Sequence, residues 1–390
     1  MRIAIVGAGI GGLAAAALLA GAGHAVQIYD QFAAPAPVGA GLIIQPVGLA
    51  VLDRLGAGGI VRARGAAIRR LLGHEAATGR AVLDVAYGTR GEDACGLGIH
   101  RAALFDALHG AALAAGARLL PGHRVVAATA GSLRFGDGSS AGRFDLVIDA
   151  SGARSAISPL AARELPYGAI WGTVDWPGDC PLAPDRLTQR YRRASRMIGV
   201  LPVGTLSDGG PRKAAVFWSL PRDGHAAWLQ AGVARWRDEA CALWPDFAPF
   251  AAQIREPGQM TMARYAHGTL ARPWGERLAI IGDAAHRASP QLGQGANMAL
   301  LDAAALAAAL ARTEGEAALR LYAAARRWHV LAYQAMSWLF TPQYQSDSRV
   351  LPVLRDRVLY PLSRMPPVPA LLSRLVRGDL LPPLGSLGGA

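Results

Sequence analysis

The sequence contains almost no lysine. Lys213 is the single one, so arginine supplies 39 of the 40 basic residues behind the formal charge of +12. These arginines are dispersed along the 390 residues, and no basic run alternates with aromatic side chains that could stack on bases. Nucleic-acid binding is therefore not expected. A general richness in alanine, glycine, arginine and proline explains much of the charge without a charged partner.

Cysteine is also scarce, and the N-terminal region lacks charge. Cys95, Cys180 and Cys241 are odd in number and far apart, which argues against a disulfide framework or a metal site and favours a reducing, cytoplasmic compartment. No Asp, Glu, Lys or Arg occurs from Ile3 to Tyr29, but four early glycines would interrupt a membrane span or signal segment. With 52% hydrophobic and 17% charged residues, a well-cored globular chain is expected.

The first thirty residues predict a strand–helix–strand unit. Arg2 to Val6 suit a buried parallel strand, Leu13 to Ala20 a helix, and His24 to Tyr29 a second strand. Parallel strands joined through a helix are the building block of α/β folds. The sequence therefore predicts a Rossmann-like domain at the N-terminus.

A glycine fingerprint lies inside this unit, in the pattern Gly7-x-Gly9-x-x-Gly12. The first glycine permits a tight turn, the second lets the backbone approach a pyrophosphate, and the third lets the helix pack closely. The phosphate would then lie at the positive end of the helix. Asp30 ends the second strand, where its carboxylate can accept hydrogen bonds from ribose hydroxyls. This pattern predicts a dinucleotide site without separating FAD from NAD.

A second glycine-rich block follows a predicted strand at Arg277 to Ile281. Asp283 would project from the end of this strand, where ligands of open α/β sheets bind. The following glycines would open a helix whose N–H groups can stabilise negative charge on a cofactor. The block consists of Gly282-Asp283-Ala284-Ala285-His286, Pro290 and Gly293-Gln294-Gly295-Ala296-Asn297. Two such turns, each passing from a strand into a helix, would fit the two ends of FAD; alternatively, Asp283 only caps a turn.

In this order the blocks resemble the class A flavin-dependent monooxygenases, the family with the p-hydroxybenzoate hydroxylase fold, over about residues 1 to 340. The resemblance implies that the first motif and Asp30 hold the ADP part of FAD, and that Asp283 holds the ribityl chain. It implies that Arg101 contacts the phosphates or ribityl. The family's Gly-Ala-Gly loop is present and ends at Gly41, a further expected cofactor residue, which would place Leu42 to Gln45 near the flavin. The residues expected at the isoalloxazine are Pro290, Gly293, Gly295, Ala296 and Asn297.

The middle motif departs from the family. The family usually carries Asp-Gly followed by Arg-Ser, implicated in binding both FAD and NAD(P)H. Here the run is Asp149-Ala150-Ser151-Gly152-Ala153-Arg154-Ser155, with Ser151 in place of the aspartate. How nicotinamide is recruited therefore stays open, whereas FAD binding does not depend on this position.

The resemblance implies an enzyme. NADH or NADPH would reduce FAD, O2 would form a flavin C4a-hydroperoxide, and one oxygen atom would hydroxylate or epoxidise an aromatic, quinone-like or polyketide-like molecule. Because the flavin carries this chemistry, the protein needs to supply binding, orientation and a dry pocket. No catalytic side chain is assigned from the sequence.

Four antiparallel strands predicted between Tyr167 and Leu220 are expected to contact the substrate. Strand alternation can place Gln189 and Tyr191 on one face, and Trp218 is a further candidate, with Trp171 and Met197. The alternative is that these aromatic residues are simply core.

The sequence also predicts the domain boundaries: an FAD-binding domain of residues 1–70, 95–160 and 270–340, an antiparallel substrate domain of 71–94 and 161–269, and a C-terminal helical segment of 341–390.

Two other functions remain open. A flavin-dependent halogenase would share the fold, but the Trp-x-Trp element and active-site lysine of the tryptophan-specific type have no counterpart here. An FAD-holding protein without turnover is the second alternative, because the middle motif is altered.

Beyond residue 348 the segment is basic and leucine-rich, which allows weak peripheral contact with an anionic membrane; helices that close over the FAD domain are the favoured interpretation.

Overall fold

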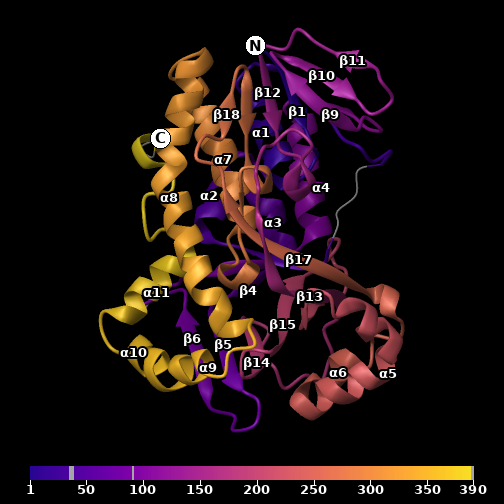
Figure 1. Ribbon diagram of the computed structural model, residues 1–390, viewed down its shortest axis with the longest axis vertical. Coiled ribbons are helices and arrows are strands. Elements are labelled where there is room, and N and C mark those ends of the chain that lie inside the picture. Colours follow the sequence, from indigo (N-terminus) through magenta and orange to yellow (C-terminus); the bar gives the residue numbers. More distant parts are fainter. Residues whose placement is uncertain (35–38, 90–91, 388–390) are drawn as a thin grey trace.

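The computed structural model describes residues 1–34, 39–89 and 92–387. A mainly parallel sheet with its helices occupies one end of the molecule, a large antiparallel sheet occupies the other, and C-terminal helices lie along one side (Figure 1). The predicted fold class, an α/β domain interrupted by an antiparallel sheet, is confirmed.

Six strands form the first sheet, in the order β18-β19-β12-β1-β2-β8. All pairs are parallel except β18 with β19. The strands are β1 (Arg2–Val6), β2 (Ala25–Tyr29), β8 (Arg118–Leu120), β12 (Leu146–Asp149), β18 (Trp274–Gly275) and β19 (Leu278–Ile280). Because β1, β12 and β19 are parallel neighbours, the segments that follow them leave the same edge of the sheet. That edge gathers Gly7, Ser151 and Asp283, which are far apart in sequence.

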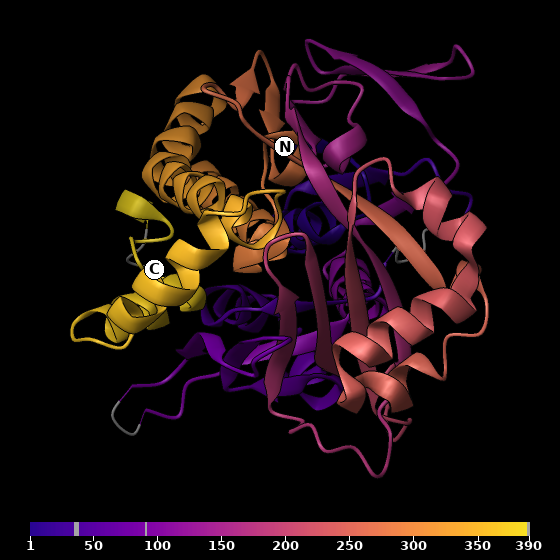
Figure 2. The same ribbon diagram turned by 60° about the horizontal axis from the view of Figure 1, so that its bottom comes forward.

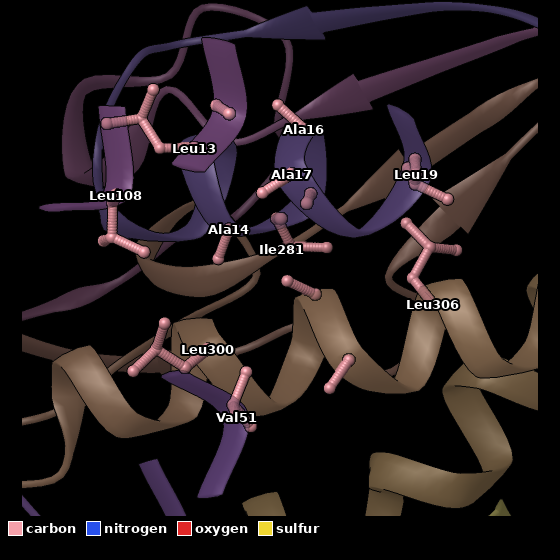
Figure 3. Close-up of a cluster of buried hydrophobic side chains, with 14 of the residues drawn as sticks. Leu13, Ala14, Ala16, Ala17, Leu19, Val51, Leu108, Ile281, Leu300 and Leu306 are labelled. Carbon is pink, nitrogen blue, oxygen red and sulfur yellow. The ribbon is translucent and has the colours of Figure 1, made fainter. Parts of the chain in front are cut away.

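Alanine-rich helices cover this sheet. They are α1 (Ile10–Gly21), α4 (Arg101–Ala114), α7 (Gly295–Leu310) and α8 (Gly315–Tyr344). Figure 3 shows Ala14 of α1 pointing toward Leu300 of α7, and Leu19 of α1 beside Leu306 of α7. Small side chains let α1 and α7 approach so closely that a Cβ on Gly11 would lie 3.3 Å from that of Ala299. The two glycine motifs therefore start adjacent helices.

The antiparallel sheet has eight strands, in the order β20-β17-β13-β16-β15-β14-β5-β6. They are β5 (Arg70–Glu75), β6 (Ala81–Ala86), β13 (Arg163–Asp175), β14 (Arg186–Arg192), β15 (Arg196–Gly204), β16 (Lys213–Pro221), β17 (Met260–Thr269) and β20 (His286–Arg287). Helices α5 (His225–Leu243) and α6 (Ala248–Ala251) cover one face (Figure 2). That face buries Trp218, Trp236 and Trp244 in one cluster. The opposite face is turned toward the parallel-sheet domain.

Two small sheets complete the fold. β3 (Gly41–Ile44), β7 (Gly96–His100) and β4 (Ala66–Ile68) form one, and β9 (Val125–Thr129), β10 (Ser132–Phe135) and β11 (Ser140–Ala141) form the other. Two short helices, α2 (Pro46–Arg54) and α3 (Gly58–Arg64), follow β3. Neither the β9–β11 sheet nor the long strand β17 was predicted. The passage from a strand into a helix expected at the second glycine block runs from β19 to α7, and two 3₁₀ turns and β20 lie between them.

The C-terminal segment folds as α9 (Leu351–Leu354), a π-helical turn (Arg355–Leu359), α10 (Tyr360–Ser363) and α11 (Val368–Arg377). It contacts both halves of the molecule: Ser373 Oγ donates to the Tyr87 carbonyl oxygen at 2.5 Å, and Gln294 Nε2 donates to the Val376 carbonyl at 3.2 Å. The segment therefore joins the antiparallel sheet to α7 and does not cover the parallel-sheet domain alone. Within the described ranges, every helix is too short or too polar to span a bilayer.

A buried ionic network fastens this segment to the second glycine motif. Asp302 on α7 is fully buried; it accepts from the Gly282 N–H at 2.9 Å, His286 Nε2 at 2.6 Å and Arg326 Nε at 2.8 Å. Burial alone would raise the pKa of the Asp302 carboxyl, but His286 and Arg326 outweigh it and hold this pKa well below its usual range. The network continues through Arg326 to His329, which bonds to the Gly378 carbonyl at 2.8 Å.

The apoprotein should lose stability as the pH falls from 6.5 toward 4, because the folded protein resists protonation of His329. Burial first, and then Arg326, lower the pKa of His329 from 6.5 to about 4. The unfolded chain therefore takes up this proton more readily, so the contribution of His329 to stability is present above pH 6.5 and falls as the pH drops toward 4, by up to about 3 kcal/mol. Urea titrations between pH 4 and pH 7 measure this loss. His329→Gln, which cannot titrate, should flatten the profile; an equal slope in both proteins would contradict the assignment.

Candidate active site

A cavity of about 1800 Å³ joins the carboxyl edge of the parallel sheet to the inner face of the antiparallel sheet. Most of the residues singled out in the sequence line it, namely Gly7, Gly9, Asp30, Gly41, Arg101, Gln189, Tyr191, Asp283, Pro290, Gly293, Gly295 and Ala296. Pockets for small ligands usually have 300–1,000 Å³. This cavity is large enough for a dinucleotide and a second molecule together.

Glycines of the first motif have different structural roles. Gly9 precedes α1, and a Cβ placed on it would meet nothing within 4 Å, so the space above it belongs to the cavity. A Cβ on Gly12 would lie 2.0 Å from the Gly7 carbonyl oxygen, so Gly12 allows close packing and does not line the cavity. No side chain caps α1, and its first turn has no acidic residue. The free N–H groups of this turn suit a phosphate.

Asp30 is fixed at the end of β2. Its carboxylate accepts hydrogen bonds from the Ala8 N–H at 2.8 Å and the Phe32 N–H at 2.9 Å. These bonds hold the carboxylate beside the glycine turn, and its remaining lone pairs face the cavity, where they can accept from ribose hydroxyls.

Arg101 is a cation without a counter-ion among the described residues. It is the first residue of α4, where the helix dipole disfavours a positive charge, and its guanidinium forms neither an ion pair nor a side-chain hydrogen bond there. Burial lowers the pKa of Arg101, and Asp283 and Tyr265 only partly oppose this shift. An unpaired guanidinium that lines the same cavity as the uncapped start of α1 fits the anionic pyrophosphate of FAD.

The second motif lies next to the first. Asp283 is exposed to the cavity while Gly282 behind it is held by Asp302. Gly293 has φ +62°, which favours glycine, and α7 begins at Gly295 without a side-chain cap. A second helix end thus faces the cavity and can stabilise negative charge on a flavin.

Asn297 is a positioning residue, which differs from the expected contact with the isoalloxazine. It is fully buried and does not line the cavity. Its Oδ1 accepts from the Gln45 N–H at 2.8 Å, while Nδ2 donates to the carbonyls of Ile43 at 3.2 Å and Gly293 at 3.0 Å. Asn297 therefore ties the end of β3 to the second glycine motif.

The polar side chains of the altered middle motif form hydrogen bonds with one another. Asp149 is fully buried and accepts from Ser151 Oγ at 2.6 Å, the Ser151 N–H at 3.1 Å and Ser155 Oγ at 2.6 Å. Its carboxylate thus stabilises the turn after β12, whereas Ser151 and Arg154 line the cavity.

Aromatic side chains form the wall contributed by the antiparallel sheet. Trp171 packs on Phe217 with ring centroids 4.5 Å apart, and Trp171 Nε1 donates to Tyr265 Oη at 2.9 Å. Gln189 and Tyr191 lie on the same face, as strand alternation suggested. The expectation for Trp218 was wrong: one residue beyond Phe217, it points to the other face and packs against Trp236.

The sequence did not reveal that the C-terminal segment lines this cavity. Arg355 is buried, pairs with Asp356 at 2.6 Å, and lies over the rings of Tyr191 and Tyr344 at 5.0 and 5.1 Å. Its Nη2 has no hydrogen-bond partner within the described part of the chain. An arginine in a leucine-rich stretch was the available signal, but only the fold places it beside Tyr191.

Replacing Asp283 by alanine should weaken FAD binding by about 10- to 100-fold, because a hydrogen bond to a charged group contributes about 1.5–3 kcal/mol. Titration of the apoprotein with FAD, followed by flavin fluorescence, measures the change. Asp179→Ala, an exposed aspartate of the other domain, is the control. Unchanged affinity in Asp283→Ala would remove Asp283 from the flavin site.

Comparison with known proteins agrees with this geometry. The family model described as FAD binding domain matches residues 1–336. An FAD-dependent urate hydroxylase of Klebsiella pneumoniae is 29% identical over 350 residues, covering 84% of this chain and 86% of its own. The 3-amino-4-hydroxybenzoate 2-monooxygenase of Streptomyces cremeus is 30% identical over 359 residues, covering 84% and 83%.

Solved structures share the fold. The crystal structure of a 2-methyl-3-hydroxypyridine-5-carboxylic acid oxygenase variant superposes with a TM-score of 0.78 at 20% identity, covering 96% of both chains. A Klebsiella pneumoniae HpxO variant complexed with FAD gives 0.77 at 23% identity, covering 98% of this chain and all of that one. Because the family model spans most of the chain, the protein belongs to the FAD-binding, class A flavin-dependent monooxygenases.

Proposed function

We propose that the protein uses FAD, NADH or NADPH, and O2 to hydroxylate or epoxidise an aromatic, quinone-like or polyketide-like small molecule. The observation that supports this most is the continuity of one cavity, which runs from the two glycine motifs to an aromatic wall. Relatives named for aromatic substrates, such as 6-hydroxynicotinate 3-monooxygenase of Bordetella bronchiseptica, favour the same class of substrate.

Bound FAD would supply the redox chemistry, taking electrons from the nicotinamide and activating O2 for transfer to an electron-rich ring. The protein would bind its pyrophosphate with the start of α1 and Arg101, and its ribose and ribityl with Asp30 and Asp283. Trp171 and Phe217 would hold the substrate ring and exclude water. Burial raises the pKa of Tyr265 well above its usual range, so its phenol stays protonated beside them.

Gln189 is the polar side chain best placed to orient a substituent of the ring. It is buried in the protein, lines the cavity, and its amide forms no hydrogen bond with the residues that the structure describes. An amide offers both donors and an acceptor, so from the cavity wall it can bond to an oxygen or nitrogen on the substrate. We propose Gln189 and Tyr191 as substrate contacts on this basis.

The test is NAD(P)H oxidation by FAD-reconstituted protein with a panel of phenols, quinolones and quinones. Stimulated oxidation coupled to incorporation of one oxygen atom from ¹⁸O2 is expected. Protein that stays colourless after incubation with FAD would sink the proposal. An FAD-loaded protein that no panel member stimulates would favour the alternative without turnover.

A halogenase is disfavoured, because the named relatives are hydroxylases and monooxygenases. Lys213, the lysine such a function could use, pairs instead with Asp175 at 2.5 Å, where β16 begins beside the end of β13. Halide-dependent product formation with a separate flavin reductase would reverse this conclusion.

We place the enzyme in the cytoplasm, with at most weak peripheral contact to an anionic membrane. From Ser348 onward six arginines oppose two aspartates, a net charge of 6 − 2 = +4, and Val350, Val353 and Met365 are exposed. Apolar and basic side chains together favour the surface of an anionic bilayer. Some co-sedimentation with phosphatidylglycerol vesicles at low salt is expected, and it should be lost at high salt. Binding that survives high salt would show a stronger anchor.

A further inference from the structure

The cavity continues past the aromatic wall into a space that one ring would not fill. We call this space the annex; it lies between the β5–β6 hairpin and the C-terminal helices. Its wall is formed by Leu71, Val82 and Val85 from the hairpin and Leu354, Leu359 and Leu372 from the C-terminal segment. Figure 1 shows the hairpin and α9–α11 at the same end of the molecule.

The annex is continuous with the proposed ring site. Trp171 and Leu187 pack against the cluster that holds Tyr191, Met197 and Phe217, and they also pack against the cluster of the hairpin and α11. Because Trp171 and the annex residues line one cavity, a molecule whose ring lies against Trp171 can extend between the hairpin and the C-terminal helices.

The charged side chains in the annex wall are already paired. Asp84 is bound by Arg70 at 2.6 Å and by Arg364, and Arg355 is bound by Asp356. An anionic chain would thus find no unpaired cation in this wall, as far as the described residues show, although Nη2 of Arg355 retains one unused donor. Apolar wall residues and neutralised charges suit an aliphatic chain.

The annex opens on the outer surface. Leu354 and Leu362 line the cavity, yet 40% and 48% of their surfaces are exposed. The same residues therefore form the wall inside and the rim outside. A flexible chain could enter or protrude here without moving the parallel-sheet domain.

We propose that the substrate is an aromatic ring carrying an aliphatic chain, and that the annex holds this chain. The inference rests on the proposed monooxygenase function, and it adds the part of the substrate that the flavin does not touch. Each buried methylene should tighten binding about three- to fourfold until the annex is filled.

The probes are 4-alkylphenols from methyl to nonyl, titrated into FAD-reconstituted enzyme and followed by flavin absorbance. We expect Kd to fall about three- to fourfold with each methylene over the first several carbons. Leu372→Trp should fill the annex and remove most of this gain, with 4-methylphenol as the reference ligand in each variant. Leu371→Trp places the same ring on the exposed side of α11, outside the cavity wall, and should keep the gain.

Leu362→Trp, at the partly exposed rim, gives a second variant in case Leu372→Trp fails to fold; it should reduce the gain for the longest chains. The proposal would be overturned if Kd were independent of chain length, or if 4-nonylphenol failed to bind. It would also be overturned if Leu372→Trp and Leu362→Trp both kept the wild-type gain in affinity with chain length. So would tighter binding of an ω-carboxyl chain, which would make Arg355 an anion site. Failure to load FAD would instead reject the proposed function.

Discussion

Gly9→Leu is expected to lower the affinity for FAD on the order of 1,000-fold while leaving the apoprotein folded. The backbone at Gly9 has φ −81°, which any residue adopts, and a Cβ there meets no protein atom within 4 Å. The leucine side chain would fit the free protein but occupy the place of the pyrophosphate, so the loss appears in cofactor binding. Flavin titration and apoprotein melting temperature separate the two effects.

Gly12→Val is the contrasting variant. Its Cβ would overlap the Gly7 carbonyl oxygen at 2.0 Å, so it should destabilise the apoprotein itself, by about 1–3 kcal/mol or more. If Gly9→Leu unfolds the chain as readily as Gly12→Val, or binds FAD normally, the space above Gly9 is not the pyrophosphate site.

Asp302→Ala should cost about 3–5 kcal/mol of folding stability, because it leaves Arg326 and His286 buried without their anion. The Gly282 N–H also loses its acceptor, so the turn before Asp283 should loosen. Chemical denaturation of the apoprotein measures the loss. The pKa of this carboxyl is depressed in the folded state, so wild-type stability should also decline as the pH falls below about 4, and the variant should lack this decline.

A double variant, Asp302→Leu with Arg326→Met, removes the stranded cation together with the anion. It should recover part of the stability that Asp302→Ala loses, because both charges are replaced by apolar groups. If the double variant is no more stable than Asp302→Ala, the cost does not arise from the unpaired buried arginine.

The sequence predicted the parts of the site that depend on backbone geometry. Gly7, Gly12 and Gly293 occupy positions where a turn or a close approach requires glycine, so these positions are recognisable in the sequence. Alternation along a strand shows which residues share a face, but it does not show which face points into the cavity, so Trp218 was assigned to the wrong face. The strand β17 was missed since Arg264 and His267 interrupt its apolar alternation. The division into domains stays a prediction.

Side chains brought together by tertiary packing could not be predicted. Arg355 and Tyr191 are separated by more than 160 residues, and their contact depends on how the C-terminal helices dock against β6. Asp302 looked like one acid in an alanine-rich helix, and its partners lie on β20 and α8. Such clusters follow from the docking of whole elements, which no local spacing encodes.

One side of the annex is built from the part of the chain that leaves the ribosome after the flavin site. Every residue proposed to hold FAD lies at or before Ala296, whereas Leu354, Leu359 and Leu372 follow it by more than fifty positions. During synthesis the helices that close this side of the annex therefore emerge last, after every residue proposed to hold FAD.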